Sequence, residues 1–175
     1  AEARRAMTKA QYEQEFECSF SAAIVGAIYG DLIEEAETGG RICGVPWERG
    51  HEVHTAWDIG IGDPTAIWFY QQHRSEIRLI DYYEDTGAGL DHYIKVLREK
   101  PYAYGRHYAP HDIEVKEMSA GGKSRRHVAA GLGINFIVTP NIKKDEGISA
   151  VRSILPRCWF DKEKCSTGIE AIRQY

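Results

Sequence analysis

Cysteines and long apolar runs are scarce in this sequence of 175 residues. The four cysteines are Cys18, Cys43, Cys158 and Cys165. They are too few for a disulfide framework and too far apart for a CxxC metal site, so we expect free thiols in a reducing compartment. The longest uncharged apolar run, residues 20–29, is about half of the roughly 20 residues that cross a membrane, and no basic leader precedes it. We expect a soluble protein without a targeting segment.

Internal repeats, low-complexity tracts and a compositional bias toward disorder are also missing. Hydrophobic residues make up 43%, aromatic residues 11% and charged residues 27% of the chain. This mixture can bury a core, and it excludes collagen-like, mucin-like, coiled-coil and disordered proteins. The length corresponds to about one domain, since domains usually have roughly 100 to 200 residues.

The net charge of -4, taken alone, argues against a nucleic-acid partner, but the charge is unevenly distributed. Residues 1–100 contain 10 basic and 18 acidic side chains, whereas residues 101–175 contain 12 basic and 8 acidic ones. If the protein has a phosphate-binding face, we therefore expect it in the second part of the chain.

The first fifty residues differ in pattern from the rest. A polar helical pattern begins at Thr8, a run of small residues covers 22–30, and turn-forming residues follow at 38–41. We interpret residues 1–50 as a connecting segment and place a domain boundary near His51.

Residues 51–175 alternate between strand and helix patterns. Three runs rich in β-branched and aromatic residues, joined by tight turns, predict an antiparallel meander, and helical spacings with short strands follow it. The predicted strands are 53–61, 65–71, 77–83, 106–109, 135–138 and 158–160, and the predicted helices are 90–100, 125–130 and 146–155. This order predicts an α/β mixed sheet, with three antiparallel strands on one side and helix-crossover parallel strands on the other, flanked by helices.

Asp58 lies in the middle of an apolar strand pattern, residues 56–60, where a carboxylate is costly unless it is paired. It could face solvent on an edge strand or meet an arginine. The glycines that follow it, Gly60 and Gly62, favour a different interpretation. They allow another backbone, or a phosphate with its metal, to approach the end of the strand closely.

Asp112 follows the predicted strand that ends at Ala109. By itself it could form a turn or a helix cap after Pro110. If its strand lies beside that of Asp58, the two carboxylates converge at one edge of the sheet and their repulsion favours a bound divalent cation. Hard oxygen ligands favour Mg²⁺ or Mn²⁺.

Two motifs occur in a fixed order, WDIGIGDPTA at residues 57–66 and PHDIE at residues 110–114, with the three-strand meander between them. Together they resemble the nuclease domain of the large terminase subunit of tailed bacteriophages. The resemblance covers residues 51–175 and implies an RNase H-like fold. It also implies that residues 1–50 are the tail and linker of a preceding ATPase domain.

The resemblance implies that Asp58 and Asp112 are catalytic, metal-binding carboxylates. Asp63 and Glu114 are further ligand candidates, although Asp63 also suits a simple turn before a proline. His111 could orient a water or contact a phosphate, and ordinary polar packing is the alternative.

The family also uses a later acidic residue, for which this sequence offers no convincing match. Asp161 is unsuitably placed, and Asp145 and Glu146 suit the first turn of a helix. The sequence ends within a helical pattern at residues 166–175, so we expect the nuclease domain to be incomplete at its C-terminal end.

A basic segment follows Asp112. Its candidate DNA-binding residues are Lys116, Lys123, Arg125 and Arg126, and Lys143, Lys144 and His111 could extend that surface. The Gly-Lys-Ser string at 122–124 is not a P-loop, because the first glycine of a Walker A motif would fall on Glu117. We expect this loop to contact the DNA backbone, and an ordinary solvated loop is the alternative.

These observations give the hypothesis of a metal-dependent endodeoxyribonuclease domain of a viral packaging terminase, cutting concatemeric duplex DNA with two Mg²⁺ or Mn²⁺ ions. The resemblance implies the portal and the small terminase subunit as partners, and a location in the host cytoplasm rather than in the mature virion. We expect no membrane partner, because no apolar run is long enough to span one. Two alternatives stay open. One is another RNase H-like nuclease, such as a resolvase or transposase core, and the other is a non-catalytic module that grips DNA or docks on the portal.

Overall fold

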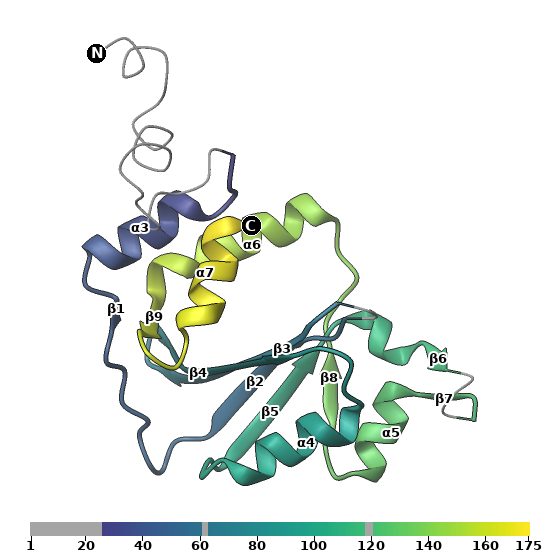
Figure 1. Cartoon of the computed structure of the whole chain (residues 1–175). Helices are drawn as coiled ribbons and strands as arrows, with labels where there is room; N and C mark the ends of the chain where they lie inside the picture. The colour runs from purple at the N-terminus through teal and green to yellow at the C-terminus, as the bar shows by residue number, and fades with distance from the viewer. Residues whose placement is uncertain (1–25, 61–62, 118–120) are drawn as a thin grey trace.

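The computed structural model describes residues 26–60, 63–117 and 121–175. They form a seven-stranded mixed sheet with helices on both faces, and a separate two-stranded hairpin (Figure 1). Within these ranges no helix is long and apolar enough to cross a membrane. Three of the cysteines, Cys43, Cys158 and Cys165, are free thiols, and Cys18 lies outside the described residues.

The centre of the sheet is the predicted antiparallel meander of β2 (Val53–Asp58), β3 (Thr65–His73) and β4 (Glu76–Asp85). Burial alternates along β2 and β3, because successive side chains of a strand point to opposite faces. The apolar side chains of this meander therefore contribute to both faces of the sheet.

Parallel strands extend the meander on both sides. Next to β2 lie β5 (Tyr104–Ala109) and then β8 (Phe136–Val138), and next to β4 lie β9 (Cys158–Asp161) and the edge strand β1 (Ile42–Cys43). The fold class is as predicted, but the expectation that all helix-crossover strands lie on one side is wrong for β9. The helix before β9 passes across the sheet, and Phe160 of β9 packs in the apolar cluster that covers that face.

Helices cover the two faces in separate groups (Figure 1). One face carries α4 (Leu90–Glu99) and α5 (Arg125–Gly131), whose residues pack with Trp57, Ile67 and Phe69. The other carries α3 (Gly30–Thr38), α6 (Lys144–Ile154) and α7 (Ser166–Gln174), which pack with Leu79 and Phe160. The described residues also contain the 3-10 turns η1 (His111–Glu114) and η3 (Leu155–Arg157).

Residues 30–43, which we expected to belong to a connecting segment, contribute α3 and β1 to this architecture. Ile33 of α3 is fully buried, and the backbone N–H of Phe160 donates to the carbonyl of Arg41 at 2.8 Å. The helical pattern predicted from Thr8 lies outside the described residues. The position of the domain boundary stays a prediction.

Candidate functional site

Asp58 and Asp112 lie at the same edge of the sheet. Asp58 is the last residue of β2, and Asp112 lies in η1, just after β5 ends at Ala109. Strands β2 and β5 are parallel neighbours, with Ala56 opposite Tyr108. Because parallel neighbours end at the same edge, the structure brings together the two carboxylates that the sequence singled out.

The backbone after β2 folds back against the strand end. A Cβ atom on Gly60 would lie 2.4 Å from the carbonyl oxygen of Asp63 and 2.9 Å from that of Pro64. Only glycine fits such an approach, which is the role that we predicted for Gly60. Gly62 lies outside the described residues. This return of the chain places Asp63 close enough to Asp58 for their charges to interact.

The electrostatics of Asp58 are unfavourable for an isolated carboxylate. Partial desolvation raises the pKa of Asp58, and the negative charges of Asp112 and Asp63 raise it further. A cation placed among these carboxylates would favour the ionised form and lower that pKa again. The ionised carboxylate of Asp58 is therefore disfavoured in this structure, and a bound cation would stabilise it.

Asp112 shows a second sign of the same requirement. Its Oδ1 is buried and has no hydrogen-bond partner in the described part of the chain. An unpaired buried carboxylate oxygen is costly, and native proteins rarely leave one unsatisfied. Carboxylate oxygens are the ligands that Mg²⁺ and Mn²⁺ prefer, so the residues present fit the divalent metal that we predicted.

A series of buried hydrogen bonds links the two strands that carry these carboxylates. The Thr55 hydroxyl of β2 lies 2.7 Å from Nδ1 of His107 on β5, and the indole N–H of Trp57 donates to the same hydroxyl at 2.7 Å. Thr55 is fully buried, and burial lowers the pKa of His107. A neutral imidazole can therefore bridge β2 and β5 and fix the relative positions of their ends.

The further ligand candidates are placed differently from the aspartate pair. Asp63 is exposed in the turn after β2 and contributes to the charge around Asp58. Glu114 is exposed on η1, where its Oε1 accepts from Nη1 of Arg126 at 2.6 Å. A predicted metal ligand and a predicted DNA contact are thus paired with one another, and their separate roles stay predictions.

The basic candidates gather partly around the β6–β7 hairpin, which sequence periodicity did not reveal. Lys116 lies in β6 (Lys116–Glu117) and Lys123 in β7 (Lys123–Ser124), and both are exposed, as is His111. The Ser124 hydroxyl accepts from the backbone N–H of His127 at 3.2 Å, so it caps α5. A capping role agrees with our rejection of a P-loop.

The remaining basic candidates lie on two helices. Arg125 lines a cavity of about 270 Å³ together with Gly60 and Thr65, near the end of β2. Lys143 and Lys144 are exposed at the start of α6, where Lys144 Nζ lies 5.6 Å from the ring centroid of Tyr175. A role for any of these residues in DNA binding stays a prediction.

Sequence reasoning missed Glu84, which lies near the acidic edge, the sheet edge that carries Asp58 and Asp112. Asp58 is opposite Ala66, and Ala66 is opposite Glu84, so the three side chains share one face of the sheet. Glu84 is exposed and accepts a 2.6 Å hydrogen bond from the Tyr82 hydroxyl. Burial raises the pKa of Tyr82, and the hydrogen bond to Glu84 and the negative charges of Glu84 and Asp58 raise it further. The only signal that could have revealed this placement is the alternation of side chains along β2, β3 and β4, which decides which residues share a face.

Comparisons with known proteins identify the fold. No protein-family model matches the sequence, and no curated protein sequence matches it. Among solved structures, the large terminase from a thermophilic bacteriophage matches with a TM-score of 0.63 at 14% identity, over 99% of this chain and 43% of the other. The P22 large terminase nuclease domain matches with a TM-score of 0.57 at 16% identity, over 78% of this chain and 75% of the other.

The chain has the fold of a large terminase nuclease domain. A further match is the large terminase nuclease of the thermophilic phage G20c with bound zinc, with a TM-score of 0.54 at 15% identity over 86% of this chain and 88% of the other. The same G20c nuclease is known with bound cobalt. This chain spans less than half of the first of these terminases, whereas it covers most of the separate terminase nuclease domains. The RNase H-like fold class predicted from the sequence is thereby confirmed.

Proposed function

We propose that this protein is the metal-dependent endonuclease domain of a viral DNA-packaging terminase and that it cuts concatemeric duplex DNA. The observation that carries the proposal is the pair of Asp58 and Asp112, which share one sheet edge. Partial desolvation and then the charges of its acidic neighbours raise the pKa of Asp58, and Asp112 Oδ1 is buried without a partner among the described residues. The terminase nuclease fold supports the same assignment.

In this proposal, Asp58 and Asp112 hold Mg²⁺ or Mn²⁺, and Asp63 and Glu84 add negative charge nearby. Bound divalent ions supply Lewis-acid activation of a water and stabilisation of the leaving 3′-oxygen, and two ions can serve the two sides of an in-line displacement. The Thr55–His107 hydrogen bond joins β2 to β5 and so holds the two aspartates in fixed relative positions. No side chain needs to act as a covalent nucleophile.

DNA contact is proposed for the exposed cations next to η1. Lys116 and Lys123 lie on the hairpin that follows Asp112, where they can neutralise phosphates without touching the carboxylates. Arg126 is held by Glu114 in an exposed ion pair, and such pairs contribute little to stability. A phosphate can therefore compete with Glu114 for Arg126 at small cost. In the packaging motor, the portal and the small terminase subunit are the proposed protein partners.

The proposal is tested by incubating the chain with supercoiled plasmid in Mg²⁺, in Mn²⁺ or in EDTA. Nicked and linear products are expected with either ion, and none in EDTA. Retention of plasmid in a gel shift without cleavage under any condition would support the DNA-gripping module instead. Preference for a four-way junction over linear duplex would support a resolvase-like nuclease.

A further inference from the structure

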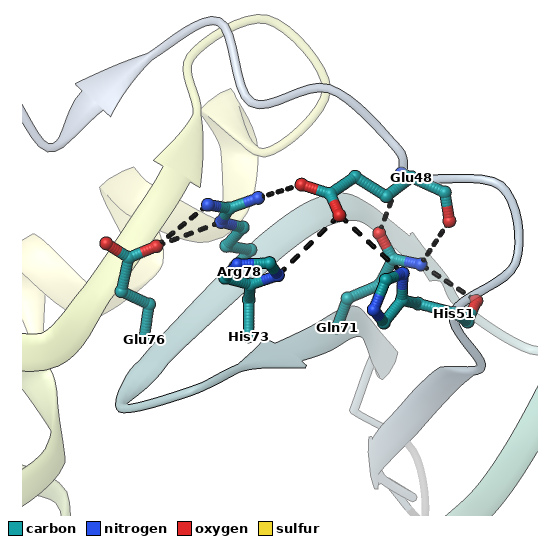
Figure 2. Close-up of polar contacts among 6 residues, drawn as sticks. All are labelled: Glu48, His51, Gln71, His73, Glu76 and Arg78. Carbon is teal, nitrogen blue, oxygen red and sulfur yellow. Dashed lines mark hydrogen bonds and ion pairs between the residues drawn. The ribbon is translucent and has the colours of Figure 1, made fainter.

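A second group of metal-ligating side chains lies at the other end of the central strands, away from Asp58. Glu48 and His51 belong to the segment that enters β2, and His73 is the last residue of β3 (Figure 2). Glu48 Oε2 lies 3.6 Å from Nδ1 of His51 and 3.6 Å from Nδ1 of His73. The three candidate ligand atoms all lie within 4.8 Å of one another.

These distances suit a shared metal better than direct hydrogen bonds. An N–H···O hydrogen bond normally measures about 2.7 to 3.2 Å, and a separation of 3.6 Å is outside that range. Zinc binds imidazole nitrogen and carboxylate oxygen at about 2.0 to 2.2 Å in tetrahedral geometry, so two of its ligand atoms are roughly 3.4 Å apart. A shift of a few tenths of an ångström would bring Glu48 Oε2 and each imidazole to that separation. The two imidazole nitrogens, which lie within 4.8 Å of one another, would also have to approach to about 3.4 Å, and rotation of the exposed His51 side chain allows this.

A buried glutamine holds the segment of Glu48 and His51 in place. Gln71 is only 2% exposed, and its side-chain amide donates to the carbonyls of Glu48 at 3.0 Å and His51 at 2.9 Å. Its Oε1 accepts from the backbone N–H of Glu48 at 2.9 Å. Because Gln71 lies two residues before His73 on β3, one strand positions all three ligand-bearing residues. Little conformational order would have to be gained when a metal binds.

Neighbouring charges fit a divalent cation. Arg78 contacts the other carboxylate oxygen of Glu48 and donates to Glu76 at 3.0 Å, which leaves Glu48 Oε2 directed toward the two imidazoles (Figure 2). One arginine and two glutamates sum to one negative charge when the histidines are neutral. Two imidazoles and one carboxylate are a ligand set that suits Zn²⁺, Co²⁺ and Ni²⁺ better than Mg²⁺.

We propose that Glu48, His51 and His73 form a binding site for a zinc-like divalent transition metal, separate from the acidic edge at Asp58 and Asp112. The side chains of His51 and His73 are 54% and 34% exposed, so an ion can enter and a water can occupy the fourth position. The bound metal joins the segment before β2 to the β3–β4 hairpin. Its function is to hold these two parts of the chain together.

The test uses the whole chain carrying Asp58→Asn and Asp112→Asn, so that the acidic edge cannot contribute. Zn²⁺ is titrated by calorimetry, and Co²⁺ is followed by its visible absorption. We expect one ion per chain, and His73→Ala should weaken Zn²⁺ binding by at least about 100-fold, because changes in the groups around metal ligands alone cost roughly 10- to 100-fold. Since the acidic edge is disabled, the result does not depend on the proposed nuclease activity.

The matched control is His92→Ala, since His92 Nε2 lies 3.2 Å from an Asp85 carboxylate oxygen and no second imidazole completes a metal-ligating group there among the described residues. Its Zn²⁺ affinity should equal that of the parent. If His73→Ala does not fold, His51→Ala replaces it, because that side chain is more than half exposed. Absence of stoichiometric Zn²⁺ binding, or an affinity unchanged by loss of His73 or His51, would overturn the proposal.

Discussion

The two ends of the central strands differ in how their polar groups are satisfied. At the end that carries Asp58 and Asp112, desolvation and neighbouring carboxylates raise the pKa of Asp58, and one buried oxygen of Asp112 has no partner among the described residues. At the other end, Gln71 and Arg78 hold Glu48 through hydrogen bonds on its backbone and side chain. The first end is under electrostatic strain that a cation would relieve, whereas the second is already ordered and would only be tightened by one.

The largest expected effect is the loss of nuclease activity when Asp58 or Asp112 is replaced. Asp58→Asn or Asp112→Asn should lower the rate of metal-dependent plasmid nicking by at least about 100-fold, since loss of outer groups at metal sites already costs roughly 10- to 100-fold. Asp31→Asn, in an exposed acid of the first turn of α3, is the control and should cut at the parent rate. If either site variant nicked plasmid at the parent rate, the assignment of that aspartate to the site would be contradicted.

The Thr55 hydroxyl supports the sheet edge that carries Asp58 and Asp112, because it links β2 to β5. Thr55→Val leaves the buried Trp57 N–H and a ring nitrogen of His107 without their partner, so the free energy of unfolding should fall by about 1 to 3 kcal/mol. Denaturant unfolding measures this change, and the exposed Thr86→Val serves as the control. A Thr55→Val change as small as that of the control, within about 0.5 kcal/mol, would contradict a supporting role.

A smaller effect is expected from the cations beside the acidic end. The double variant Lys116→Gln and Lys123→Gln should weaken DNA binding and flatten the slope of log affinity against log salt by up to about 0.9 for each lost phosphate contact. Lys162→Gln with Lys164→Gln, in the turn after β9, is the matched control on the other side of the sheet. An unchanged slope in the hairpin variant would identify the β6–β7 hairpin as ordinary solvent-facing chain.

Much of the fold could be predicted because its signals are local. Periodicity and turn residues located β2 to β5, α4 to α6 and β9 to within a few residues. The strands β1, β6 and β7 have two residues each, which is too short for any period to show. The side of the sheet on which β9 lies depends on packing across a whole face, and a linear sequence does not record it.

The site was predictable to a different extent at the two ends. Asp58 ends β2 and Asp112 comes just after β5, and the parallel pairing of these two strands brings both residues to one edge. Glu84 required the register of two hairpins, one of which shifts between Phe69 and Tyr70. Glu48, His51 and His73 have no recognisable spacing, because a buried side chain, Gln71, brings them together from a loop and a strand end.

The most direct test of the account is the thermal stability of Asp58→Asn and the parent with and without Mg²⁺. A raised pKa in the folded state means that stability is lost as pH rises from the ordinary aspartate pKa, about 3.9, through the folded value, so the amide variant should be more stable at neutral pH and equal below that range. Mg²⁺, which avoids imidazole, should raise the melting temperature of the parent and leave the variant unchanged. A parent that is insensitive to Mg²⁺, or a variant that is stabilised as much as the parent, would contradict a cation site at Asp58.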